Sequence, residues 1–191
     1  MKSSVRIIDR GFFIFGENGM NFEAMNMFLS AENIKKHLEH LRTLRLKYSV
    51  LEKSVPEIVG RDILEISKLR ISSQIREEAT RLLWNIRSHE LFFDSFTDRP
   101  TWTNKEISRE KLMYDILQMS YDKDYGFIYI YNDRNGRIKI SHSIEYDGAF
   151  VTYTPGLCID VCEHVYFCDY GFKKDRYVGG ALSYLNTGKL T

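Results

Sequence analysis

The spacing of apolar residues changes along this chain, and the change limits the folds open to it. Over residues 34–51 apolar side chains recur every three or four positions, which indicates an amphipathic helix. Beyond Gly126 the period falls to two in residues 127–131 and 137–141, and the Asn-Gly pair between these runs predicts a β-hairpin. The chain is therefore expected to be α+β, with an N-terminal helical hairpin lobe and a C-terminal lobe of helices and a small antiparallel sheet.

Capping residues and helix breakers set the expected boundaries. Ser30 is a candidate N-cap, with Glu32 in the first turn, and Pro56 and Gly60 follow the end of that helix. The other expected elements are a helical region at 61–96 with a break near 72–73, a helix at 105–119 capped by Asn104, a third strand at 149–153 and a last helix at 174–185. The predicted divisions are an irregular N-terminal arm (1–28), a helical lobe (29–100) and an α+β lobe (101–191).

Length, charge and cysteine content narrow the class of protein. The 191 residues suffice for one domain or two small lobes, and 27 basic against 26 acidic residues argue against a strongly basic nucleic-acid binder. No apolar run has the length of a membrane span, and no cleavage site follows an apolar core near the N-terminus, so we expect a soluble protein that is not secreted. Three cysteines within residues 158–168 make a poor disulfide framework, which favours a reducing compartment, mitochondrial or cytoplasmic.

The segment from Cys158 to Tyr170 concentrates ionisable groups. Asp160, Glu163 and His164 lie within five residues, among apolar and aromatic neighbours. Burying such groups is costly unless something pairs with them, and carboxylate and imidazole are good ligands for first-row metals. Taken alone, the segment favours the alternative, an acidic first turn of a helix with one hydrogen-bonded histidine, and the metal hypothesis depends on residues elsewhere in the chain.

Histidines on the predicted helices extend the metal hypothesis. His37 lies beside the apolar stripe of the first helix, and His89 lies among aromatic residues, where a buried core histidine is the alternative. With Asp160 and His164 they would make a site of three imidazoles and one carboxylate between the lobes, which suits iron or manganese better than thiolate-rich zinc. The remaining histidines are expected at the surface: His40 and His142.

Four stretches resemble the iron/manganese superoxide dismutase family. Asp160-Val-Cys-Glu-His-Val-Tyr-Phe-Cys-Asp-Tyr170 is similar to the family signature Asp-Val-Trp-Glu-His-Ala-Tyr-Tyr-x-Asp-Tyr. Ser30-Ala-Glu-x-Ile-x-x-His37 resembles the start of the family's first helix, and His89-Glu-Leu-Phe-Phe93 resembles its His-x-x-Tyr/Phe-Trp motif. The predicted hairpin falls where the family's sheet begins. The resemblance covers about residues 28–187.

The resemblance implies one iron or manganese ion per chain, held by His37, His89, Asp160 and His164. It implies disproportionation of superoxide to oxygen and hydrogen peroxide. It also implies a dimer, either a homodimer or a heterodimer with a related subunit, because Glu163 matches the glutamate that reaches the partner's metal histidine in the family. No membrane partner is expected.

Three residues depart from the family near the entrance and the dimer interface. Arg45 stands in place of the gateway tyrosine; as a cation it can attract superoxide, plug the entrance or pair with an acid. Leu41 and Phe167 replace a histidine and a tyrosine that bond across the family's dimer, so an apolar contact is expected there instead of a proton relay.

Other departures concern the groups expected around the metal. Asn85 replaces the glutamine of iron-type members, and Cys162 replaces the tryptophan of the signature. Glu145 or His142 stands where manganese-type members supply an amide. Such changes shift the metal's potential and the pKa of its bound water.

These departures leave more than one function open. Retention of all four ligands favours a divergent superoxide dismutase. The alternative is a superoxide-dismutase-like scaffold subunit of a larger assembly such as a mitochondrial ribosome, with reduced or no catalysis and with RNA or ribonucleoprotein as its partner. A metal protein with another oxidoreductase activity is the third hypothesis.

Overall fold

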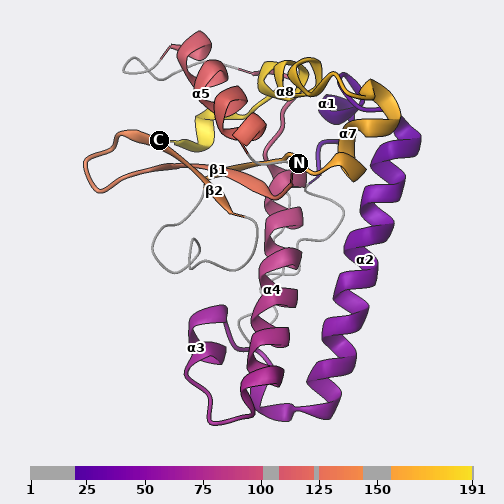
Figure 1. Cartoon of the computed structure of the whole chain (residues 1–191), viewed down its shortest axis with the longest axis vertical. Coiled ribbons are helices and arrows are strands. Elements are labelled where there is room, and N and C mark those ends of the chain that lie inside the picture. The colour runs from indigo at the N-terminus through magenta and orange to yellow at the C-terminus, as the bar shows by residue number, and fades with distance from the viewer. Residues whose placement is uncertain (1–19, 101–107, 123–124, 144–155, 191) are drawn as a thin grey trace, which may run out of the picture.

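The computed structural model describes residues 20–100, 108–122, 125–143 and 156–190 (Figure 1). Its most prominent feature is a pair of long helices that lie side by side, α2 (Ala31–Ser54) and α4 (Ser73–Asp94). The chain turns between them through η2 (Pro56–Ile58) and α3 (Ile63–Ser67). The sheet and the C-terminal helices gather at the opposite end of this pair (Figure 1).

Helix α2 begins where the sequence predicts. The Ser30 hydroxyl accepts a hydrogen bond from the Asn33 N–H, and Pro56 lies just beyond the last helical residue, Ser54. Its buried positions recur at helical spacing and form one face: Asn33, Ile34, His37, Leu41, Leu44 and Tyr48. Helix α2 packs against both α4 and α7, which places His37 inside the molecule.

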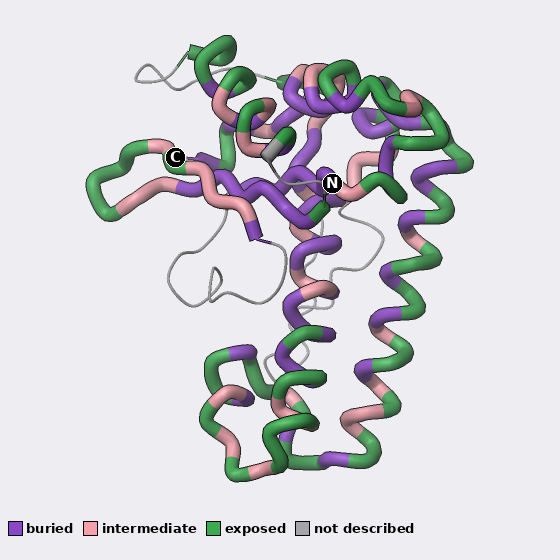
Figure 2. The backbone as a smooth tube through the Cα atoms, in the orientation of Figure 1, coloured by how far each residue is buried: buried purple, intermediate pink, exposed green. Residues whose placement is uncertain are grey.

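The predicted break near residues 72–73 is confirmed. Helix α3 begins with a capping box. The Asp62 carboxylate accepts a hydrogen bond from the Glu65 N–H, and the Glu65 carboxylate accepts one from the Asp62 N–H. Ser72 then caps α4 by accepting from the Ile75 N–H. Helix α4 is buried over much of its C-terminal half, which carries His89 (Figure 2).

The sheet has three antiparallel strands in the order β2-β1-β3, namely β1 (Phe127–Asn132), β2 (Ile138–Ser143) and β3 (Leu157–Asp160). The hairpin between β1 and β2 is confirmed. Asp133 Oδ1 accepts from the backbone N–H groups of Asn135 and Arg137, and Gly136 has a φ of 75°, in the left-handed region that favours glycine.

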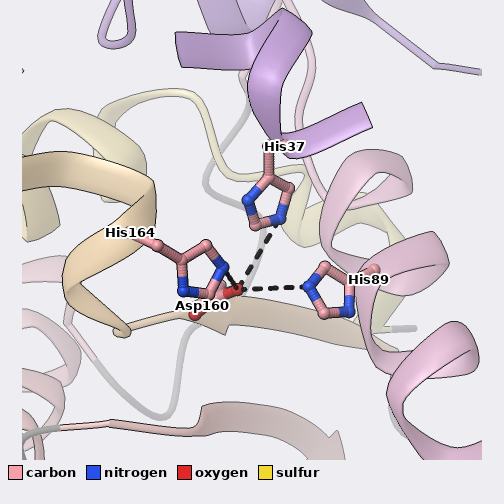
Figure 3. A group of neighbouring side chains, drawn as sticks. All are labelled: His37, His89, Asp160 and His164. Atoms are coloured by element: carbon pink, nitrogen blue, oxygen red, sulfur yellow. Dashed lines mark ion pairs between the residues drawn. The ribbon is translucent and has the colours of Figure 1, made fainter. Parts of the chain in front are cut away.

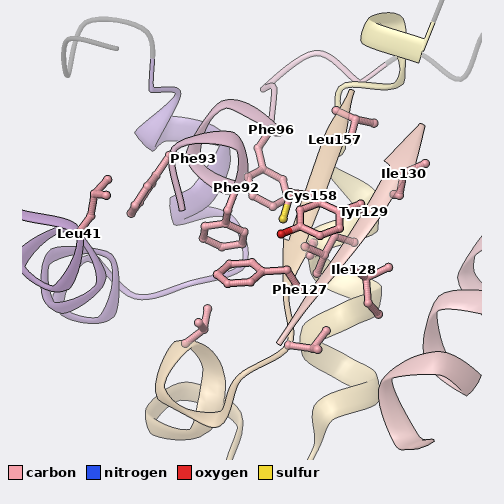
Figure 4. Packing of buried hydrophobic residues seen from close by; sticks show 14 of the residues in the cluster. Leu41, Phe92, Phe93, Phe96, Phe127, Ile128, Tyr129, Ile130, Leu157 and Cys158 are labelled. Carbon is pink, nitrogen blue, oxygen red and sulfur yellow. The ribbon is translucent and has the colours of Figure 1, made fainter. Parts of the chain in front are cut away.

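The core is continuous from the helical pair to the sheet (Figure 4). In Figure 4 the phenylalanines at the end of α4 lie between Leu41 of α2 and the aromatic and aliphatic side chains of β1 and β3. The remaining elements cover the sheet end: α5 (Arg109–Asp122), α7 (Glu163–Tyr170), α8 (Lys174–Ser183) and η3 (Thr187–Leu190). Packing of α7 on both α2 and α8 joins the first and last parts of the chain.

Several boundaries differ from the prediction. Asp160 is the last residue of β3 rather than a residue after the sheet, because this short strand is buried throughout and shows no alternation. Asn21 caps a short helix, α1 (Phe22–Asn26), within the predicted irregular arm; five residues are too few for a periodic signal. Helix α5 begins at Arg109 and α8 ends at Ser183, two to four residues inside the predicted ranges.

Other predictions fall outside the described residues: the strand at 149–153, the Asn104 cap and the first nineteen residues of the arm. The boundary between the lobes near residue 100 therefore stays a prediction. Among the described helices, none is long and apolar enough to cross a bilayer.

Candidate metal centre

Four side chains from four different elements converge where the helical pair meets the sheet (Figure 3). His37 comes from α2, His89 from α4, Asp160 from the end of β3 and His164 from the first turn of α7. Their potential ligand atoms all lie within 4.8 Å of one another. The structure thus brings together the four residues that the sequence singled out, although they span more than 120 positions of the chain.

The distances suit one shared ion. Asp160 Oδ2 lies 3.6 Å from His37 Nε2, 3.8 Å from His89 Nε2 and 3.6 Å from His164 Nε2. Ligand atoms that share a metal at roughly 2.1 Å are themselves about 3 to 4 Å apart. Small rotations of the side chains would place all four atoms around a single cation.

The imidazoles are neutral near pH 7, so the three short approaches are not ion pairs. Burial lowers the pKa of His37 well below its usual value, and the neighbouring histidines add to this effect. Burial lowers the pKa of His89 to about 3 and that of His164 to about 4. Burial also raises the pKa of Asp160 to about 7. No imidazolium is available in the cluster to compensate an ionised carboxylate.

The donor set is unsatisfied within the described part of the chain. His37 Nδ1 and Nε2, His89 Nε2 and Asp160 Oδ2 are buried and have no hydrogen-bond partner there. Leaving such atoms unpaired costs about 1 to 3 kcal/mol each. A divalent cation would satisfy three of these atoms at once and would stabilise the Asp160 carboxylate, so the residues present fit iron or manganese.

Neighbouring groups orient two of the candidate ligands. His89 Nδ1 lies 2.7 Å from the Asn85 carbonyl oxygen, which only accepts, so Nδ1 carries the proton and Nε2 keeps its lone pair. Asp160 Oδ1 accepts from the Cys162 N–H at 2.9 Å, which leaves Oδ2 directed at the histidines. The Tyr177 hydroxyl donates to the Asp160 carbonyl at 2.7 Å and fixes the end of β3.

Cys162 occupies the position of the family's tryptophan. It is the N-cap residue of α7, and its sulfur accepts a hydrogen bond from the Gly126 N–H at 3.1 Å. Together with its backbone bond to Asp160, this ties the start of α7 to β1 and β3. Cys162 therefore positions the two ligands that flank it, Asp160 and His164.

His40 lies closer to the cluster than the sequence indicated. It is exposed, as expected, yet its ring centre is 5.1 Å from that of His89 and 5.5 Å from that of His164. A signal for this was present, because positions three apart on a helix share a face and His40 follows His37 by three.

Arg45 adopts one of its three expected roles. Its guanidinium donates from Nη2 and Nε to Glu90 Oε1, at 2.7 and 3.2 Å. The Glu90 side chain is only 11% exposed and that of Arg45 31%, so the pair is largely shielded. Burial raises the pKa of Glu90, an effect that Arg45 opposes. Sequence reasoning missed Glu90, whose only signal was its place beside His89.

The residues predicted to lie in the dimer interface differ in their exposure. Leu41 is 1% exposed and packs in the chain's own core, so it is not available to a partner; Glu163 and Phe167 are exposed on α7.

The Asn85 side-chain amide donates to the Arg81 carbonyl of its own helix, and its role near the metal stays a prediction. Glu145 lies outside the described residues, and His142 Nε2 lies 2.8 Å from the Tyr125 carbonyl oxygen.

A cluster of three histidines and an aspartate between a helical pair and a small sheet defines a candidate mononuclear metal protein with an α+β fold. Residues 107–190 match the model of the family described as iron/manganese superoxide dismutases, C-terminal domain. The comparison with curated proteins gave no match. This matched C-terminal region carries Asp160 and His164, and the match supports membership of the iron/manganese superoxide dismutase family.

Proposed function

We propose that this protein disproportionates superoxide to oxygen and hydrogen peroxide at one iron or manganese ion held by His37, His89, Asp160 and His164. The observation that carries the proposal is the buried donor set whose lone pairs have no other partner in the described residues. When bound, either metal would supply one-electron chemistry through two adjacent oxidation states.

The surrounding residues have separate tasks in this proposal. The side chains of His37, His89 and Asp160 are almost completely buried, so bulk water does not contact these three ligands. His164, with 46% of its side chain exposed in the single chain, is the least buried of the four ligands. Arg45 adds little net attraction for the superoxide anion, because the Glu90 carboxylate neutralises it.

Association through α7 is part of the proposal. Glu163 and Phe167 are exposed there, and the Phe167 ring contacts that of Phe172, which is 91% exposed. Exposed aromatic pairs are typical of interfaces. These residues support a homodimer or a heterodimer with a related subunit.

The test combines metal content with dismutation by the purified protein. We expect about one iron or manganese ion per chain and dismutation well above that of His164→Ala, since each ligand contributes strongly to retention. Cys168→Ala, an exposed position on the same helix, is the matched control and should behave as the wild type. A metallated protein no faster than His164→Ala would contradict the enzymatic proposal.

A scaffold role is the second candidate, and exposed aromatic residues favour it. Tyr114, Tyr121 and Tyr125 are each more than half exposed at the α5 end of the molecule, in addition to Phe172 on the side of α7. Large exposed aromatic side chains suit a surface that a macromolecular partner covers. Sedimentation of the protein with large ribonucleoprotein particles, without dismutation, would support this role over the enzymatic one.

A further inference from the structure

Gly126 lies directly before β1 and is bonded to the segment that carries two of the candidate ligands. Its carbonyl oxygen accepts a hydrogen bond from the Val161 N–H at 3.0 Å, and its own N–H donates to Cys162 Sγ at 3.1 Å. Both partners lie between Asp160 and His164 in the chain. The turn before β1 is therefore tied to the segment that joins these two ligands.

The Cys162 side chain is bonded to Gly126 in both directions. Its sulfur accepts from the Gly126 N–H, and its S–H donates to the Gly126 carbonyl oxygen at 3.7 Å. The backbone N–H of the same cysteine donates to Asp160 Oδ1 at 2.9 Å. Cys162 thus connects a candidate ligand on one side to Gly126 on the other.

The Cys162 side chain does not act as an ordinary helix cap. An N-cap side chain usually accepts from an N–H in the first turn of its own helix. Within the described residues, the Cys162 side chain makes no such bond to α7, and its sulfur is directed at Gly126 instead. The start of α7, and with it His164, is therefore held by a contact outside the helix.

Only glycine fits at position 126 with this backbone. Gly126 has a φ of 113°, in the region that favours glycine. A Cβ atom at this position would lie 2.4 Å from the Ser143 carbonyl oxygen and 2.9 Å from His142 Nε2. Both atoms belong to the end of β2, so a side chain at position 126 would displace the turn from the sheet.

We propose that Gly126 and Cys162 are positioning residues for the metal centre. Their hydrogen-bonded clasp holds residues 160–164 so that Asp160 Oδ2 and His164 Nε2, which lie 3.6 Å apart, keep a spacing that one ion can bridge (Figure 3). Neither residue is a ligand; the clasp governs how firmly, and in which geometry, the ion is held. The inference rests on the proposed function only in taking the cluster as a metal site.

The first test loads the protein with Mn²⁺ and follows release of the ion to an excess of chelator. We expect Cys162→Ala, which removes the sulfur, to release Mn²⁺ about tenfold faster, in line with the loss of a group that orients a metal ligand. Cys162→Ser, whose hydroxyl can make both bonds to Gly126, should restore most of the wild-type rate. Cys168→Ala, an exposed cysteine on α7, is the control and should match the wild type.

A second measurement separates positioning from general stability. The visible absorption spectrum of the Co²⁺-loaded protein depends on the coordination geometry. We expect Cys162→Ala to change this spectrum and Cys162→Ser to retain that of the wild type. Gly126→Ala should behave as Cys162→Ala does in both measurements, because its Cβ would clash with Ser143.

Release at the wild-type rate or an unchanged Co²⁺ spectrum in Cys162→Ala would overturn the clasp. Cys162→Val fills the space without an acceptor, so wild-type behaviour of this variant would also overturn it, by showing that only packing matters. Circular dichroism checks that each variant is folded, and Cys162→Val serves for the comparison with Cys162→Ser if Cys162→Ala is not. A wild type that holds the ion without dismutating superoxide would contradict the proposed function alone, whereas one that holds no ion would overturn both.

Discussion

Arg45 of α2 and Glu90 of α4 form a largely shielded ion pair directly beside His89, with Nη2 and Oε1 2.7 Å apart. The pair joins the two helices that supply His37 and His89. Its position therefore links the packing of the helical pair to the geometry of the candidate metal centre.

Removing one member of this pair should be costlier than removing both. Arg45→Met leaves the Glu90 carboxylate without its main partner, and we expect a loss of roughly 2 to 3 kcal/mol in the free energy of unfolding, below the value for fully buried pairs because Arg45 is partly exposed. The double variant Arg45→Met/Glu90→Leu should recover most of this loss. Urea unfolding of the two single variants and the double variant measures it; additive losses would show that the pair is not coupled.

Asp169 should make a pH-dependent contribution to stability. Burial alone would raise the pKa of Asp169, but its carboxylate accepts from the Ser30 N–H at 2.8 Å and from Asn33 Nδ2 at 3.1 Å, and its pKa is lowered overall. A carboxyl group whose folded pKa lies below its unfolded value of 3.8 stabilises the folded state above that value, and the contribution is lost as the pH falls through the folded pKa.

We therefore expect Asp169→Ala to cost about 1 kcal/mol at pH 7, a modest figure because the group is mostly exposed. The difference between Asp169→Ala and the wild type should shrink at pH 3, as measured by denaturant unfolding at both pH values. A difference that is equal at pH 3 and pH 7 would mean that the ionised form of Asp169 has no special role.

Phe167 of α7 and Phe172 in the turn after it form an exposed aromatic pair. This pair predicts self-association or pairing with a related subunit. Phe172→Ser removes the more exposed of the two rings, whose centres lie 5.3 Å apart. If α7 forms a dimer interface, this change should weaken association by about tenfold or more, because exposed aromatic anchors dominate interface energies. Analytical ultracentrifugation of both proteins measures this, with Tyr114→Ser, at another exposed aromatic position on α5, as the control; equal weakening by both changes would argue against α7.

Metal binding should raise stability through the same four residues. A ligand present at about a thousandfold its dissociation constant adds roughly 4 kcal/mol to the free energy of unfolding. We expect Mn²⁺ to raise the melting temperature of the wild type but to leave that of His89→Ala unchanged, since Nε2 of His89 is one of the unsatisfied donors. A rise of equal size in the variant would place the ion elsewhere.

Local features of the fold were predictable from the sequence, whereas contacts set by helix packing were not. The Ser30 cap and the hairpin around Gly136 depend on residues a few positions apart, and both are confirmed. The pair of Arg45 with Glu90 depends on how α2 lies against α4, across 45 positions, and no local pattern specifies it.

In the candidate site, too, the residues in recognisable local segments were predictable, whereas a contact set by helix packing was not. His37, His89, Asp160 and His164 were predictable because each lies in a short segment that resembles a known family, and the fold brings them together. The contact of His40 with two of these rings was missed. Its spacing of three from His37 indicated a shared helix face, but how close its ring comes to His89 and His164 depends on the packing of α2 against α4 and α7.

One iron or manganese ion is expected to occupy the cluster of three histidines and one aspartate. The most direct test is the metal content of the purified protein, measured by inductively coupled plasma mass spectrometry for the wild type and for His37→Ala, with Thr43→Ala on the same helix as control. We expect about one ion per chain in the wild type and the control, and a content at least about tenfold lower in His37→Ala. A wild type without iron or manganese, or a His37→Ala variant that retains the full content, would contradict it.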